Sequence, residues 1–403
     1  MKNAYIVDGT RTAIGNFKGT LATVRTDDMI AAVIKTLVEK HPEIPQTRYD
    51  DVIIGCANQA GEDNRNVARM AVLLAGLPVT VPGETVNRLC ASGMSAVSQA
   101  NRAIKAGEGD IFIAGGVEGM SRGPYVLSKA ENSFDTGQKM YDSSFGWRFI
   151  NPKMEQLYGT EAMGKTAENL AKMYQITREE QDEFALNSQM KATKAQKSGR
   201  LLEEITDILT PQKKGEPYIF NQDEFIKPNT SAEILAKLKP AFVKENGTVT
   251  AGNASGLNDG AAAVIVASEE AVREFALKPL AKIVASAVTG TEPRIMGIGP
   301  VEATKLVLKR AGLTLDQIDV IELNEAFAAQ SIACLRELGL KNDDPRVNIN
   351  GGAIALGHPL GMSGTRITYS AALELQKSHK KHALCTMCIG VGQGYAIILE
   401  RVE

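Results

Sequence analysis

The sequence predicts an α/β protein built from two similar halves, which are separated by a long inserted segment. Buried strand-like runs alternate with helical patterns, as is typical of βαβ units and mainly parallel sheets. Two parts of the chain also match at a constant offset of 268 positions, since Asp51 corresponds to Asp319 and Gly93 to Gly361. One shared tripeptide would be explained by chance, whereas two matches at one offset favour an internal duplication.

The elements of the two halves follow the same order. Each half shows a strand-like run, an apolar-periodic helical pattern and a later buried strand that leads into a Gly-rich turn. Their ranges are 4–7, 29–40 and 110–116 in the first half, and 281–284, 303–312 and 383–390 in the second half. The sequence therefore predicts two α/β units of the same design.

The segment between the halves differs in character, because it contains charged helical and irregular stretches. We expect residues 1–120 and 249–272 to form the first half, 121–248 an inserted loop domain, and 273–403 the second half. A capping box of Thr177 and Glu180 predicts a helix start in the insertion. Its charges are typical of a solvated face, and a segment of this length can also cover a site.

The composition narrows the partners that we expect. The 403 residues include 45 basic and 47 acidic side chains, so no overall charge attracts nucleic acid or an anionic membrane. The five cysteines are an odd number, which fits a reducing compartment better than a disulfide framework. The chain shows no signal-peptide pattern and no long apolar run. We therefore expect a cytoplasmic protein.

Cys90 is the strongest candidate for a nucleophile among the five cysteines. It lies in the segment TVNRLCASGMSAV, where small residues open a helical pattern directly after it. A helix amino terminus favours a thiolate, so this position predicts a lowered pKa for the thiol. Most lone cysteines are inert core residues, and Cys56 and Cys334 are interpreted in that way.

His358 is the candidate base for this thiol. It lies in the Gly-rich run NINGGAIALGHPLGMSG, and the repeat offset places it opposite Cys90. If the halves pack about a pseudo-twofold axis, such matched positions meet near the axis. A core histidine bonded to a carbonyl is the alternative. His41, His379 and His382 are set aside, the last two because they lie in a polar stretch that is typical of a solvated turn.

Two strand ends supply further candidates. Cys388 ends a strand before a Gly-rich turn, where a thiol can move a proton and exposed N–H groups can bind an oxyanion. Asn324 ends another strand and can orient a water or carbonyl, although a plain turn is the alternative. The Cys385–Cys388 spacing resembles half of a zinc site, but no second pair exists and a strand would point the two sulfurs to opposite faces. We expect no metal.

The motifs LCASGMSA, NEAF, GHPLGMSG and CIGVGQG, in this order, resemble those of the thiolase family over essentially the whole chain. The segments DGTRTAIG, AGGVEGMS and VTAGNASGLNDGAAA extend the resemblance. It implies the thiolase-type duplicated fold, in which two βαβαβαββ-like halves form a layered αβαβα core with a loop domain over the active site. It also implies an acyltransferase that uses coenzyme A as a co-substrate, with no permanently bound cofactor, and that assembles as a homodimer or homotetramer.

The resemblance also implies roles for individual residues. Cys90 resembles the acyl-accepting nucleophile, His358 its base, and Cys388 the acid/base that serves the acetyl-CoA enolate. His358 and Asn324, through a water, resemble one oxyanion hole, and the N–H groups of Cys90 and Gly390 resemble the second. Expected coenzyme A contacts and pocket walls are Ser255, Ala251, Lys227, Met163 and Phe327.

The prediction of which thiolase subfamily the chain resembles rests on shorter stretches of sequence. The stretches GCANQAGEDNRNVARMA and YDSSFGWRFINPKMEQLYGTEAMGKTAEN look most like thiolases that act on 3-oxoadipyl-CoA. Acetoacetyl-CoA-specific relatives carry a His-Met pair in the region where this chain has Glu161, Ala162 and Met163. We hypothesise that Arg148 or Lys153 binds a terminal carboxylate of the acyl chain, whereas solvated loop charges are the alternative.

Three other functions compete with this interpretation. A broad-specificity or acetoacetyl-CoA thiolase differs only in the acyl chain that it accepts. A decarboxylating ketoacyl synthase shares the fold but generally needs a second histidine, and this chain has Cys388 at that position. A non-catalytic acyl-CoA-binding module would be expected to lose Cys90, His358 or Cys388, and all three are present.

Overall fold

The strands of the two halves form one continuous path in the computed structural model, which describes residues 2–212 and 214–402. The two halves join where β1 pairs antiparallel with β12 through Tyr5–Lys282 and Ile6–Ala281. The path runs through β13 (Val320–Leu323), β14 (His382–Ile389), β15 (Gln393–Arg401), β12 (Ala281–Gly290), β1 (Ala4–Thr12), β11 (Asn258–Ser268), β5 (Ile111–Gly119), β3 (Asp51–Gly55) and β4 (Glu84–Val86). Short strands β2 (Gly15–Asn16) and β8 (Ile205–Thr206) pair with β11 and β1.

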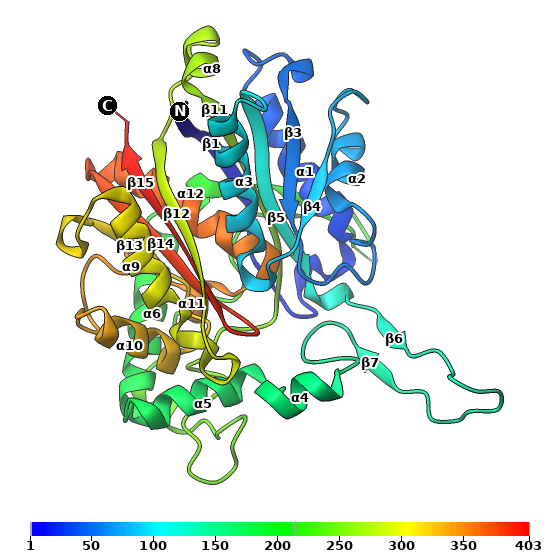
Figure 1. Ribbon diagram of the computed structural model, residues 1–403, viewed down its shortest axis with the longest axis vertical. Coiled ribbons are helices and arrows are strands. Elements are labelled where there is room, and N and C mark those ends of the chain that lie inside the picture. The colour runs from blue at the N-terminus through cyan, green and yellow to red at the C-terminus, as the bar shows by residue number, and fades with distance from the viewer. Residues whose placement is uncertain (1, 213, 403) are drawn as a thin grey trace.

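The helices are arranged in the layers that the resemblance implies. On the outer face of the first half lie α1 (Thr26–Glu39) and α2 (Val67–Leu74), and on that of the second half lie α9 (Gly299–Ala311) and α10 (Ala328–Glu337). Between the two sheet halves lie α3 (Ser92–Ala106) and α12 (Leu360–Ser378), which share one apolar core (Figure 1). The predicted αβαβα layering is confirmed.

The duplication is visible in the positions of the central helices. The first residues of α3 and α12, Ser92 and Leu360, are separated by the same 268 positions as the sequence matches. Cys90 and His358 therefore each lie two residues before the start of an equivalent helix. This confirms the expectation that the repeat places them at matching points of the two halves.

The predicted pairing of the strands is wrong in part. Parallel pairing occurs between β3 and its neighbours β4 and β5 and between β13 and β14, whereas the long strands in the middle of the path pair antiparallel. In the second half, β14 returns as β15 after a turn of three residues, and so short a connection allows only antiparallel pairing. The alternating pattern of strand-like and helical segments in the sequence does not reveal such a hairpin.

The inserted segment forms an arm and a helical cover. The arm contains β6 (Tyr125–Leu127) and β7 (Met140–Asp142) and extends away from the body of the molecule (Figure 1). The capping box predicted at Thr177 is present at the start of α6. Other elements are α4 (Pro152–Tyr158), α5 (Met163–Met173), α6 (Arg178–Lys197), β9 (Ile208–Thr210), β10 (Tyr218–Phe220) and α7 (Ala232–Ala236), with α8 (Glu269–Glu274) and α11 (Ala353–Leu356) outside the insertion. Within the described residues, no helix is long and apolar enough to cross a membrane.

Candidate active site

Cys90 lies in a tight turn, Leu89–Ala91, immediately before α3. Leu89 has a φ of 47°, which a leucine rarely adopts, so the turn is held in a strained form. The half-buried sulfur lies near the helix amino terminus, as expected. The expected lowering of its pKa is wrong, because burial raises the pKa of the Cys90 thiol, and the N–H groups of Gly390 and Cys90 offset this only in part. The thiol therefore needs a base.

His358 is held as a neutral base. Its Nδ1 lies 2.6 Å from Ser363 Oγ, and this hydroxyl donates its own proton to the carbonyl oxygen of Pro359 at 2.9 Å. Ser363 can therefore only accept from Nδ1–H, which leaves Nε2 without a proton. Burial, together with the charge of Arg366, lowers the pKa of His358 to about 4. Ser363 corresponds to Ser95 at the repeat offset of 268 positions, but the sequence gives no sign of this bond.

Asn324 brings an amide to the free nitrogen of this histidine. It follows β13 directly and is completely buried, and its N–H donates to the carbonyl oxygen of Thr386 at 3.0 Å. Its Nδ2 lies 3.4 Å from His358 Nε2, and its Oδ1 has no hydrogen-bond partner within the described chain. Asn324 therefore lies beside His358, and its part in the reaction stays a prediction.

Cys388 lies close to Cys90 at the end of β14. Its side chain packs in an apolar cluster with Met163 and Phe327. Burial raises the pKa of the Cys388 thiol well above its usual value, and the nearby sulfur of Cys90 raises it further. Cys388 is therefore a protonated thiol in the free protein. Cys385 lies in the core between α3 and α12 instead, so the two sulfurs are separated as expected for a strand.

The comparisons with known proteins agree with this geometry. Residues 4–270 match the model described as thiolase, N-terminal domain, and residues 277–401 match the thiolase, C-terminal domain. The chain belongs to the thiolase family.

Its relatives cover the whole chain. The chain is 58% identical over 402 residues, 100% of both chains, to a protein of Acinetobacter baylyi named beta-ketoadipyl-CoA thiolase. It is 57% identical, again over 100% of both chains, to the Escherichia coli 3-oxoadipyl-CoA/3-oxo-5,6-dehydrosuberyl-CoA thiolase. A crystal structure of the Bacillus anthracis acetyl-CoA acetyltransferase matches with a TM-score of 0.92 at 40% identity, covering 100% of this chain and 99% of the other.

In this thiolase, a row of residues leads from Cys388 to the surface. The N–H of Ser255 donates to the Ala326 carbonyl oxygen at 3.0 Å, beside Phe327 in the Cys388 cluster. The next residue, Gly256, lies against the ring of Phe225, and the Lys227 Nζ lies 4.0 Å from the centroid of that ring. This row connects the buried thiols with a basic surface. Ala251, also expected near coenzyme A, is exposed.

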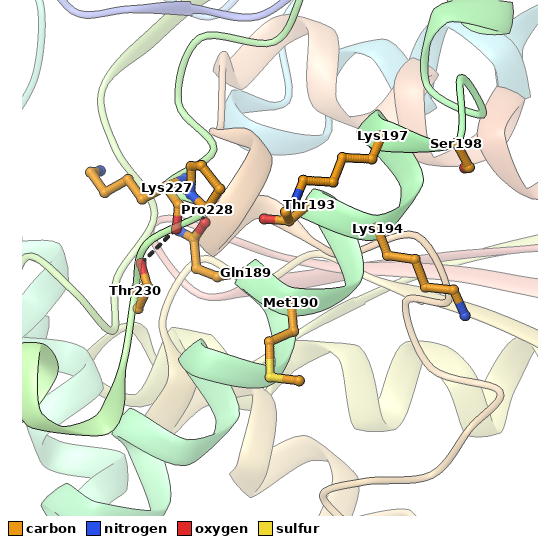
Figure 2. A pocket seen from close by; sticks show the side chains of 9 residues that line it. All are labelled: Gln189, Met190, Thr193, Lys194, Lys197, Ser198, Lys227, Pro228 and Thr230. Carbon is orange, nitrogen blue, oxygen red and sulfur yellow. Dashed lines mark hydrogen bonds between the residues drawn. The ribbon is translucent and has the colours of Figure 1, made fainter.

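The row ends at a cavity of about 460 Å³ between α6 and the loop that carries Lys227 (Figure 2). Three lysines lie there, and none has a carboxylate within 4.0 Å in the described chain. Burial lowers the pKa of Lys227. The sequence pointed to Lys227 alone, because the charges of α6 were interpreted as a solvated face. The lining residues are Gln189, Met190, Thr193, Lys194, Lys197, Ser198, Lys227, Pro228 and Thr230.

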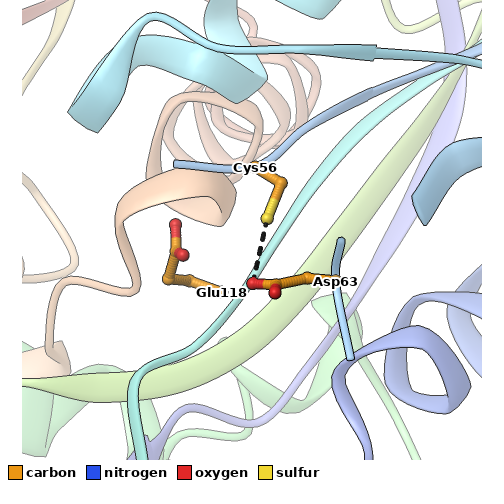
Figure 3. Close-up of side chains that lie close together, drawn as sticks. All are labelled: Cys56, Asp63 and Glu118. Atoms are coloured by element: carbon orange, nitrogen blue, oxygen red, sulfur yellow. Dashed lines mark hydrogen bonds between the residues drawn. The ribbon is translucent and has the colours of Figure 1, made fainter. Parts of the chain in front are cut away.

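Cys56, Asp63 and Glu118 form a buried cluster beside the site (Figure 3), with potential ligand atoms within 4.8 Å of one another. The Cys56 thiol donates to Asp63 at 3.4 Å, and its pKa is raised well above the usual value by burial. Glu118 accepts from the N–H groups of Ala57, Asn58 and Gly361, and burial raises its pKa to about 7. These atoms are occupied by bonds within the protein, so the cluster is better explained as structural than as a metal site.

Glu118 was missed by the sequence interpretation. Its carboxylate joins the loop after β3 to the first turn of α12, which begins two residues after His358. Nothing in a single sequence shows that one carboxylate accepts from both segments. The interpretation of His382 as part of a solvated turn is wrong, since His382 is buried at the start of β14, with Nδ1 3.2 Å from the Gln317 carbonyl oxygen.

Proposed function

We propose that this thiolase cleaves 3-oxoadipyl-CoA with coenzyme A to give succinyl-CoA and acetyl-CoA, and that the reaction is reversible. The observation that carries the reaction type is that the turn of Cys90 packs against α12, which begins just after His358, while Cys388 lies near Cys90 and Asn324 lies beside His358. The full-length relatives named for 3-oxoadipyl-CoA support the substrate. The alternative is a broad-specificity or acetoacetyl-CoA thiolase, which the resemblance to an acetyl-CoA acetyltransferase structure keeps open.

The first half of the proposed reaction forms an acyl-enzyme. Nε2 of His358 takes the proton of Cys90, and the resulting thiolate attacks the 3-keto carbon of the substrate. The bond between C2 and C3 breaks, and its electron pair goes to the thioester enolate. The thiol of Cys388 protonates C2, so acetyl-CoA leaves while the acyl group stays on Cys90. The raised pKa of the Cys388 thiol keeps the proton on its sulfur until the carbanion, a much stronger base, forms at C2.

The second half returns the acyl group to coenzyme A. The Cys388 thiolate takes the proton of the incoming thiol, whose sulfur attacks the acyl carbon. Cys90 leaves as a thiolate and regains its proton from His358. The N–H groups of Cys90 and Gly390 would bind the oxyanion of the tetrahedral intermediates, and Asn324 with protonated His358 would bind the enolate oxygen. Each such site contributes about 3 to 4 kcal/mol in comparable enzymes.

Coenzyme A is proposed to lie along the row from Cys388 to the basic cavity. Ser255, Met163 and Phe327 would contact the pantetheine arm, with Ala251 at the exposed end. The phosphates would lie at Lys227, and Lys194 and Lys197 would add positive charge from α6. Replacing Lys194 and Lys197 by Ala tests this placement, because it should raise the KM for coenzyme A and leave kcat nearly unchanged.

The remaining proposals concern the oligomeric state, the cellular compartment and the absence of other ligands. Strand β4 lies at one end of the sheet path, and the arm exposes the side chains of Tyr125, Leu127, Phe134 and Met140. These features support a homodimer or homotetramer, which sedimentation would measure. We also propose that the enzyme works in the cytoplasm without a permanently bound cofactor or metal, and that it binds neither nucleic acid nor membranes.

The two-thiol reaction is tested by separating its halves. The Cys90→Ala variant should form no acyl-enzyme with acetyl-CoA, as measured by the mass of the intact protein. The Cys388→Ala variant should still be acylated but should lose about 10²-fold or more in the cleavage of 3-oxoadipyl-CoA. Normal cleavage by Cys388→Ala would refute the two-thiol mechanism, and Cys56→Ala is a control that should keep both half-reactions.

A further inference from the structure

Trp147 and Arg148 lie between two walls of the Cys90 site. The indole N–H of Trp147 donates to the Glu161 carbonyl oxygen at 3.3 Å, and the ring lines a small cavity together with Met163 and Val391. Val391 follows Gly390, whose backbone N–H hydrogen-bonds to the Cys90 sulfur and lowers its pKa. Trp147 therefore contacts the wall that the inserted segment and the second half supply.

Arg148 contacts the opposite wall. Its Nη2 donates to the side-chain oxygen of Asn58 at 3.1 Å. The preceding carbonyl oxygen, of Ala57, accepts from Nδ2 of Asn87 at 3.0 Å, and Oδ1 of Asn87 accepts from the N–H of Leu89 at 2.9 Å. A short series of hydrogen bonds therefore links the Arg148 contact to the residue before Cys90.

The charge of Arg148 is not balanced by a carboxylate in the described part of the chain. Within the described chain, no carboxylate lies within 4.0 Å of its guanidinium, which donates only to neutral oxygens of Ser143 and Asn58 at 3.1 to 3.4 Å. A guanidinium has five N–H donors, so part of its capacity is left. Two other arginines of this region differ, since Arg294 pairs with Glu161 and Arg122 with Glu62.

Lys153, the other residue that the sequence suggests for binding the carboxylate, lies in a different environment. It lies on α4, which buries none of its residues, and its side chain is exposed. An exposed ammonium on such a helix is well hydrated and adds little selectivity. Half-burial next to the site makes Arg148 the better partner for an anion.

We propose that Arg148 binds the terminal carboxylate of a dicarboxylic acyl chain whose 3-keto carbon lies at Cys90. The planar guanidinium matches a carboxylate with two parallel hydrogen bonds, and an unpaired, half-buried arginine gains most from such a partner. This inference rests on the proposed function and names the group that selects its substrate class.

The test compares two substrates that differ in the terminal carboxylate, 3-oxoadipyl-CoA and 3-oxohexanoyl-CoA. The wild-type enzyme should prefer the first by kcat/KM, and Arg148→Gln should reduce that preference about 10- to 100-fold. Arg148→Lys keeps the charge but loses the paired hydrogen bonds, so its preference should be intermediate. Lys153→Gln removes one positive charge on the same segment and should keep the wild-type preference.

The outcomes separate this inference from the proposed function. If the wild type does not prefer 3-oxoadipyl-CoA, the proposed substrate is wrong, and the role of Arg148 falls with it. If the wild type has the preference and Arg148→Gln keeps it, only the role of Arg148 is wrong. If Arg148→Gln lowered kcat/KM equally for both substrates, Arg148 would have a structural role instead. Acylation of Cys90 by succinyl-CoA and butyryl-CoA, followed by mass, gives the same comparison without carbon–carbon cleavage.

Discussion

At the scale of single residues, two histidines have opposite effects on stability as pH changes. Burial lowers the pKa of His358 to about 4 in the folded protein, below the usual value of 6.5. The unfolded chain therefore binds a proton more readily between these pH values, so the folded state loses stability as pH falls from 6.5 to 4. His41 differs, because hydrogen bonds to Asp8 and Glu43 raise its pKa. Its contribution is present at low pH and is lost as pH rises through the raised pKa.

This difference predicts opposite slopes for two variants. Between pH 6.5 and 4, the unfolding free energy of His358→Gln should gain up to about 3 kcal/mol relative to the wild type, because the variant has no buried imidazole to protonate. His41→Gln should lose stability relative to the wild type as pH falls from the raised pKa of His41 to 6.5, and the difference should change little below pH 6.5. Urea unfolding at several pH values measures both effects. If the unfolding free energies of His358→Gln and the wild type changed with pH in the same way, the buried, neutral state of His358 would be contradicted.

The residues that the sequence identified are those whose position follows from the repeat or from an element boundary. Cys90 precedes a helix and Asn324 ends a strand, and both features can be recognised in the letters alone. The pKa of Cys90 could not be predicted, because it depends on burial by segments far away in the chain. The hydrogen bond from His358 to Ser363 was missed for a related reason, since it depends on the path of the turn between them.

At the scale of elements, the contact between α3 and α12 sets the distance between the two halves of the site. A Cβ on Gly93 would lie 2.4 Å from Thr365 Oγ1 and 2.5 Å from the carbonyl oxygen of Gly361. Both distances are too short for packed atoms, so the helices approach closely only because residue 93 has no side chain. The sequence showed this glycine as a repeat match and not as a helix contact.

Gly93→Ala should therefore push α12 away from α3. We expect a loss of about 1 to 3 kcal/mol in the unfolding free energy. We also expect a lower kcat with acetoacetyl-CoA, because His358 precedes α12 while Cys90 precedes α3. Gly290→Ala is the matched control, since the nearest atom to its new Cβ lies 4.0 Å away. A stable, fully active Gly93→Ala variant would show that the helices tolerate a wider separation.

At the scale of the whole molecule, the fold was more predictable than the cover of the active site. The duplication gave the order of the elements in both halves, because it repeats along the chain. The antiparallel pairings at the centre of the sheet and the path of the inserted segment depend on contacts between distant residues. One of these contacts is a buried group of charges that binds the insertion to the first strand, and it was not visible in any motif.

Arg11 of β1 is the centre of that group. It is fully buried, donates to Glu204 at 2.9 Å, and binds both oxygens of Asp223 at 2.7 and 2.9 Å. Both carboxylates belong to the inserted segment, and Glu204 also accepts from Ser370 of α12 at 2.9 Å. The group therefore joins the insertion to both halves of the core.

Arg11→Met should leave two buried carboxylates with too little compensating charge. We expect a loss of about 3 to 5 kcal/mol in the unfolding free energy, as for other buried ion pairs that lose one partner. Arg273→Met is the control, because it breaks an exposed pair with Glu269 on α8 and should change little. Urea unfolding followed by circular dichroism measures both variants. Limited proteolysis should also cut the insertion of Arg11→Met before the rest of the chain, since the lost contact is the one that holds it. Equal stability of the two variants would mean that apolar packing alone secures the insertion.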